Sequence, residues 1–104
     1  MQKEIIILGD IEMGGGTLTD DFISDKALSK LVYSLCNKNV PVDLVLNGDT
    51  FDFLKCPYIV NNNAVYPRHI TSDISLAKLR LIYRAHAPVF EALKRFAAEK
   101  KNRL

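Results

Sequence analysis

Apolar and polar residues along this chain predict the order strand, helix, strand, helix. Residues 5–8 (IIIL) and 44–46 (LVL) are short runs of Ile, Leu and Val, which is typical of strands buried in a sheet that helices flank. Between them, apolar residues recur every three or four positions and predict a helix from Ser24 or Asp25, either of which can cap it, to about Asn37. The apolar stripe of this helix comprises Leu28, Leu31, Val32 and Leu35.

A second helical region is predicted over residues 72–101. Pro88 interrupts it, either as a kink or as the first residue of a new helix after a break. Its inward stripe comprises Leu79, Ile82, His86, Val89, Leu93 and Phe96. Residues 55–71, which contain two prolines and three consecutive asparagines, predict a long loop, and loops of this length are often functional.

Two acidic loops follow the two predicted strands. Gly9-Asp10-Ile11-Glu12 comes after residues 5–8, and Gly48-Asp49-Thr50-Phe51-Asp52 comes after residues 44–46. Ligands of open α/β sheets bind outside the carboxyl ends of the strands, so the two loops are expected to meet there. If the backbone is still extended, Asp10 and Glu12 leave on one face. Clustered carboxylates repel one another unless a cation neutralises them, so the loops predict a metal site built from Asp10, Glu12 and Asp49.

At these loops the chain resembles the calcineurin-like metallophosphoesterase superfamily. The first two signatures of that superfamily are Asp-x-His and Gly-Asp-x-x-Asp, which read here as Asp10-Ile11-Glu12 and residues 48–52. The similarity extends to the neighbouring segments 13–16 (MGGG) and 20–22 (DDF). The chain looks most like the branch that contains the UDP-2,3-diacylglucosamine pyrophosphohydrolases.

The resemblance implies an α/β fold, the N-terminal part of a four-layer αββα sandwich, and hydrolysis of a phosphate ester or phosphoanhydride with two divalent metal ions. It implies that Asp10, Glu12 and Asp49 bind metal, that Asp49 and Asp52 serve catalysis, and that Asp52 orients a neighbouring ligand. Glu12 stands where most relatives carry a histidine. Because a carboxylate is a harder ligand than imidazole, manganese is the expected metal, with magnesium, iron and zinc as alternatives.

The later signatures of the superfamily are absent from residues 1–104. The only histidines are His69 and His86, and neither lies in a Gly-Asn-His sequence. Residues 101–104 resemble the approach to a third strand. We therefore expect residues 1–104 to be the N-terminal segment of a single phosphoesterase domain, truncated before that strand. Such a segment is expected to be poorly active alone and to self-associate through an uncovered face of its sheet.

Other residues leave alternatives open. Arg68 and His69 could hold the phosphate of a phosphorylated small-molecule or nucleotide-type substrate, or could lie in a solvated loop. The Gly-rich segment 14–16 could cradle phosphate, which would favour a mononucleotide-binding α/β module; an inactive binding or assembly module is a further alternative. On the apolar stripe, His86 is expected to be a hydrogen-bonded core residue. Asp20 and Asp21 are expected to cap a turn.

Composition is that of an ordinary globular segment, with 48% hydrophobic and 25% charged residues. No apolar run has the length that a bilayer or a signal peptide requires, so a cytoplasmic location without a membrane span is expected.

Cys36 and Cys56 are expected to be reduced packing thiols. Residues 1–54 contain nine acidic and four basic residues (net −5), whereas residues 55–104 contain three and ten (net +7), mainly on the polar side of the second helical region.

Overall fold

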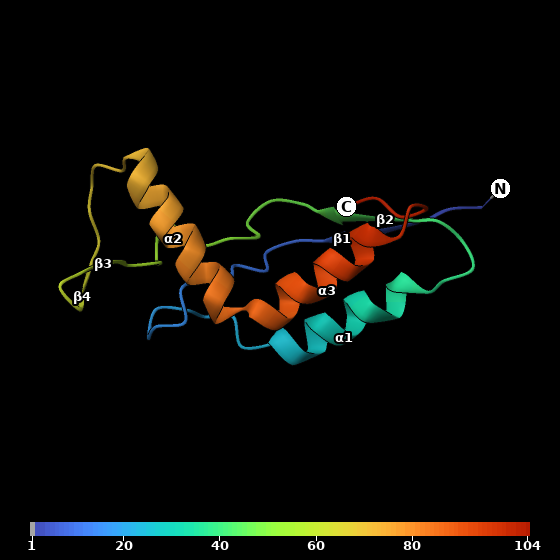
Figure 1. The fold of residues 1–104 in the computed structure, drawn as a ribbon, viewed down its shortest axis with the longest axis horizontal. Coiled ribbons are helices and arrows are strands. Elements are labelled where there is room, and N and C mark those ends of the chain that lie inside the picture. The colour runs from blue at the N-terminus through green and yellow to red at the C-terminus, as the bar shows by residue number, and fades with distance from the viewer. Residues whose placement is uncertain (1) are drawn as a thin grey trace.

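The computed structural model describes residues 2–104 as a small, elongated α/β domain of 53 × 24 × 21 Å. Three helices and two small sheets make up the described part of the chain (Figure 1). The elements in chain order are β1 (Glu4–Leu8), α1 (Asp25–Cys36), β2 (Val42–Leu46), β3 (Tyr58–Val60), β4 (Asn63–Val65), α2 (Ser72–Ala85) and α3 (Ala87–Ala98). None of the helices in residues 2–104 is long and apolar enough to cross a membrane.

The two predicted strands lie next to each other as a parallel pair. β1 and β2 pair in register from Glu4 opposite Val42 to Leu8 opposite Leu46, so their carboxyl ends reach the same edge of the sheet. On the other side of β2, Arg103 forms a parallel bridge with Asp43. Arg103 therefore lies beside β2 where a third parallel strand would pair, and the approach of residues 101–104 to such a strand stays a prediction.

One face of this sheet carries the core. α1 and α3 lie side by side along it (Figure 1), and they cover the side chains of Val42 and Leu44, which are fully buried. The alternate residues point the other way because successive side chains of a strand leave opposite faces. Ile5, Ile7 and Val45 are 59%, 62% and 40% exposed, respectively. Within residues 2–104 the helices therefore flank one face of these strands, and the other face carries exposed apolar side chains.

The predicted helices are largely confirmed, with local differences. α1 begins at Asp25 and ends at Cys36, close to the predicted bounds, but Leu31 of its stripe is 41% exposed. The second helical region is two helices that meet at His86, with Pro88 in the first turn of α3, where its missing N–H costs no hydrogen bond. Leu79 of the predicted stripe is 37% exposed and lies outside the core, so that assignment is wrong.

Part of the predicted loop at residues 55–71 is a β-hairpin. β3 and β4 pair in antiparallel fashion, and the connecting Asn61 and Asn62 have φ angles of 49° and 64°. Two central residues with positive φ characterise the type I′ turn, whose twist matches that of the strands, and asparagine tolerates this conformation well. The hairpin lies at the end of the molecule farthest from β1 and β2 (Figure 1).

Candidate functional site

The two acidic loops run side by side beyond the carboxyl ends of β1 and β2. The backbone N–H of Glu12 donates to the carbonyl of Asp49 at 2.7 Å, and that of Met13 donates to the carbonyl of Thr50 at 2.9 Å. The N–H of Asp52 donates in turn to the carbonyl of Met13 at 2.8 Å. Met13 is fully buried, which anchors the paired loops to the core. The predicted meeting of the two loops is confirmed.

The loop backbone is not extended where the acidic residues lie. Asp10, Glu12 and Asp49 have φ angles of 52°, 56° and 48°, and Gly48 has a φ of 71°. The left-handed conformation costs a residue with a side chain roughly 1–2 kcal/mol, so the surrounding contacts must hold these residues in place. The extended backbone on which a shared face for Asp10 and Glu12 depends is therefore not present.

Three of the carboxylates line one pocket of about 370 Å³. Glu12, Asp49 and Asp52 line it together with Phe51, Phe53, Leu54 and Lys55. Asp10 is exposed and does not line it. Within residues 2–104, no three His, Cys, Asp or Glu side chains are gathered closely enough to hold a metal ion. The assignment of Asp10, Glu12 and Asp49 as ligands stays a prediction.

Lys55 supplies positive charge to this acidic pocket. Its Nζ lies 2.7 Å from Oδ2 of Asp21 and 3.6 Å from Oδ2 of Asp52. These carboxylates, Asp21 most and then Asp52 and Glu12, raise the pKa of the Lys55 ammonium above its ordinary value. The backbone N–H of Lys55 also donates to Oδ1 of Asp52 at 3.0 Å. The sequence did not single out Lys55, although a lysine three residues after Asp52 is close enough in the chain to pair with its carboxylate.

Arg68 and His69 are not brought to this pocket. Both are exposed and lie in the segment between β4 and α2, at the end of the molecule that holds the hairpin (Figure 1). Neither lines the pocket of Glu12, Asp49 and Asp52. Their role in holding substrate stays a prediction that the geometry of this chain does not favour.

The amides of the Gly-rich segment already have an anionic partner. The N–H groups of Gly14 and Gly16 donate to the carboxylate of Asp20 at 3.0 and 2.8 Å, and that of Phe22 donates to it at 3.1 Å. Burial raises the pKa of Asp20, but these three N–H donors together with His86 outweigh it and hold this pKa below its ordinary value. The prediction of a cap on the turn before Phe22 is confirmed for Asp20, whereas Asp21 pairs with Lys55 instead.

His86 joins three parts of the chain in the core. Its Nε2 lies 2.6 Å from Oδ2 of Asp20, and its Nδ1 lies 2.6 Å from Oδ1 of Asp25. The histidine is 3% exposed, and the ring of Phe22 contacts it edge-on at a centroid distance of 5.5 Å. The prediction of a hydrogen-bonded core histidine is confirmed. Cys36 and Cys56 are also buried and free, as expected.

Comparison of the chain with models of protein families, with curated proteins and with solved structures found no match. The functional interpretation therefore depends on the paired acidic loops and on the motifs that they carry.

Proposed function

We propose that this chain belongs to a metal-dependent hydrolase of phosphate esters or phosphoanhydrides, similar to the calcineurin-like metallophosphoesterases. The observation that carries the proposal is the direct hydrogen bonding of the two acidic loops at the carboxyl ends of adjacent parallel strands. Acidic turns at strand ends are common one at a time. Two that are hydrogen-bonded to each other, with Glu12, Asp49 and Asp52 lining one pocket, bring into one region the oxygen donors that a divalent cation prefers.

In this proposal Glu12 and Asp49, which line the pocket, hold the metal together with Asp10, which does not line the pocket and has to turn towards it. Carboxylate oxygens suit hard cations such as manganese and magnesium. The carboxylate oxygens that line the pocket are the ligands such an ion prefers. Their side chains would have to rotate towards the ion, because no three of them are close enough together to hold it in this conformation of residues 2–104. Lys55 balances the acidic charge of the pocket and binds Asp52, which keeps Asp52 beside the paired loops. A bound divalent ion would supply a water molecule of lowered pKa for hydrolysis. Residues 1–104 offer ligands for one ion, and a second ion would need further ligands.

The proposal places residues 2–104 in the N-terminal part of a four-layer αββα sandwich. The exposed side chains of Ile5, Ile7 and Val45 support it, because a further layer or a second copy of the chain would cover them. The same exposed face favours the alternative of a binding or assembly module that self-associates. The mononucleotide-binding alternative is weakened, since Gly14 and Gly16 already donate their N–H groups to Asp20.

Metal binding tests the proposal directly. Replacing Asp49 with asparagine should lower the affinity for manganese by at least about tenfold, because a neutral amide is a weaker ligand for a hard cation. Titration calorimetry of wild type and Asp49→Asn measures this difference. Asp73→Asn, an exposed acidic residue in the first turn of α2, is the matched control and should bind manganese like the wild type. Equal manganese uptake by wild type and Asp49→Asn would contradict the proposal.

Hydrolysis of bis-p-nitrophenyl phosphate separates an enzyme from an assembly module. We expect slow, manganese-dependent hydrolysis that EDTA and Asp49→Asn both abolish. Manganese binding without any hydrolysis would favour the assembly module over the enzyme.

A further inference from the structure

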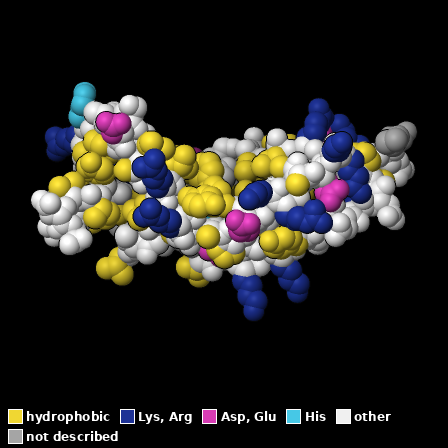
Figure 2. Space-filling model, in the orientation of Figure 1, with side chains coloured by type: hydrophobic (Ala, Val, Ile, Leu, Met, Phe, Trp, Pro, Cys, Tyr) yellow, Lys and Arg dark blue, Asp and Glu magenta, His cyan; other side chains and the backbone are white. Residues whose placement is uncertain are grey.

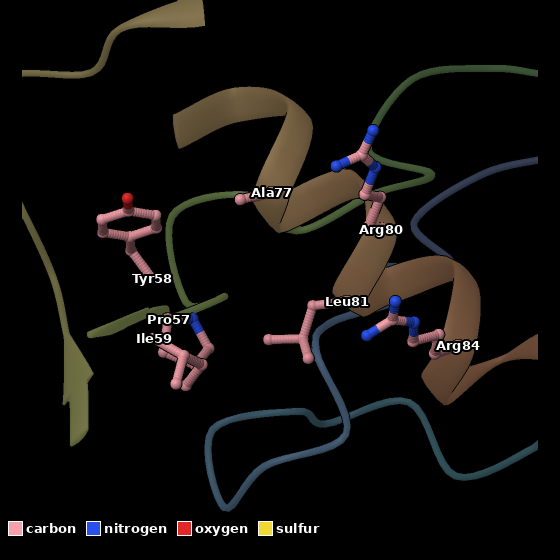
Figure 3. Close-up of a pocket in the computed structure, with 7 residues that line it drawn as sticks. All are labelled: Pro57, Tyr58, Ile59, Ala77, Arg80, Leu81 and Arg84. Carbon is pink, nitrogen blue, oxygen red and sulfur yellow. The ribbon is translucent and has the colours of Figure 1, made fainter. Parts of the chain in front are cut away.

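A second pocket, of about 430 Å³, lies between α2 and the hairpin (Figure 3). Its apolar lining comprises Pro57, Ile59, Ala77 and Leu81. Figure 3 shows Leu81 extending from α2 towards Pro57 and Ile59, with the ring of Tyr58 also on the hairpin side. None of the residues that line the acidic pocket lines this one, so the two are separate sites.

Two arginines of α2 also line this pocket. Arg80 and Arg84 are one helical turn apart, and like charges at this spacing repel one another. Among the described residues, neither guanidinium takes part in any of the ion pairs or side-chain hydrogen bonds that the structure shows. In contrast, Arg95 lies 3.0 Å from Glu99, and Arg103 lies 2.7 Å from Asp43. Figure 2 shows Lys and Arg side chains over α2 beside hydrophobic side chains.

We propose that this pocket binds a phosphomonoester that carries an aromatic or apolar body. Guanidinium groups bind phosphate oxygens through paired N–H donors, and two of them match the nearly two negative charges of a phosphomonoester at neutral pH. The ring of Tyr58 and the apolar lining then contact the organic body of the ligand. The volume lies within the range of roughly 300–1,000 Å³ that small-molecule sites occupy.

Binding of 1-naphthyl phosphate tests the proposal. The titration is made with EDTA present, so that metal at the acidic loops does not contribute and a failure here is distinct from a failure of the proposed hydrolase. Arg80→Gln and Arg84→Gln should each weaken binding roughly tenfold, the loss expected for a charge-assisted hydrogen bond. Arg95→Gln on α3 removes the same charge away from the pocket and should bind like the wild type. No binding by the wild type, or equal losses in all three variants, would overturn the proposal.

A second comparison tests the apolar part of the site. The wild type should bind 1-naphthyl phosphate more tightly than inorganic phosphate by about tenfold, because the naphthyl group is removed from water. Ile59→Ser should reduce this preference without changing the affinity for inorganic phosphate. Ile59 is 44% exposed, so the variant is expected to fold, and circular dichroism verifies this. Uridine monophosphate and dihexanoyl phosphatidate, titrated in the same way, distinguish a nucleoside body from an acyl body. Equal affinities for inorganic phosphate and all three organic phosphates would overturn the proposal.

Discussion

At the scale of single residues, His86 is a buried polar residue that links three segments of the chain. It lies between Asp20 in the loop after β1 and Asp25 at the start of α1, and its own position is the junction of α2 and α3. The apolar stripe of the second helical region predicts that His86 is buried. Its partners could not be predicted, because they are more than sixty residues away in sequence and only the packing of α1 against α3 brings them together.

Removing the histidine should destabilise the fold. His86→Ala leaves the buried carboxylate of Asp20 and the partly buried one of Asp25 without their common partner, and breaking a buried pair in this way costs about 3 kcal/mol. Urea unfolding followed by circular dichroism measures the loss in the free energy of unfolding. His69→Ala, at an exposed position, is the control and should stay within about 0.5 kcal/mol of the wild type. A loss of similar size in both variants would contradict this role of His86.

The lowered pKa of Asp20 predicts a specific dependence of stability on pH. An aspartate whose pKa is lower in the folded than in the unfolded chain stabilises the fold above the ordinary pKa of 3.8, and this contribution is lost as the pH falls through the folded value. Asp20→Asn should therefore be less stable than the wild type by about 1–3 kcal/mol at pH 6, and by less at pH 3.

Urea unfolding at pH 6 and at pH 3 measures the two differences for Asp20→Asn. Asp21→Asn changes an exposed neighbour that is paired with Lys55 at the surface, and it should cost under about 1 kcal/mol at pH 6. A difference between wild type and Asp20→Asn that does not change with pH would show that the charge of Asp20 does not contribute.

At the scale of elements, the strands and helices that follow from the local spacing of apolar residues were predictable. The two apolar runs gave rise to neighbouring parallel strands, and the stripes of residues 25–36 and 87–98 became α1 and α3. The hairpin was missed although its signals were present, since Asn61-Asn62 follows the β-branched Ile59-Val60. Two asparagines with positive φ form the turn that such a segment favours.

The backbone of the acidic loops was beyond sequence reasoning. A local pattern does not predict that Asp10, Glu12 and Asp49 all adopt left-handed conformations. These conformations depend on hydrogen bonds between the two loops, which exist only once β1 and β2 have paired. The placement of Lys55 among the carboxylates depends on the same tertiary arrangement. The position of the candidate site was therefore predictable, but the geometry of its side chains was not.

At the scale of the whole molecule, the helices cover one face of the β1–β2 sheet, and no element of residues 2–104 covers the exposed Ile5, Ile7 and Val45 on the other, open face. Asp43 is the acidic residue of β2 on the open face, and it is paired with Lys3 at 3.0 Å and with Arg103 at 2.7 Å. Arg103 and Lys3 hold the pKa of Asp43 well below its ordinary value. The charge of Asp43 is thereby balanced, so it does not repel a second copy of the chain at this face.

This open face predicts self-association. Burying Ile5, Ile7 and Val45 against the same residues of a second copy removes apolar area from water, which favours association by about 25 cal/mol for each Å². Replacing Ile5 and Ile7 with threonine keeps the β-branched shape that a strand favours but reduces the apolar area that association buries. The dimer dissociation constant should therefore rise by at least about tenfold. Sedimentation equilibrium measures the constant. Leu18→Thr, at a fully exposed loop position, is the control and should associate like the wild type. A wild type that remains monomeric, or a double variant that associates equally well, would show that the open face does not bind a second copy.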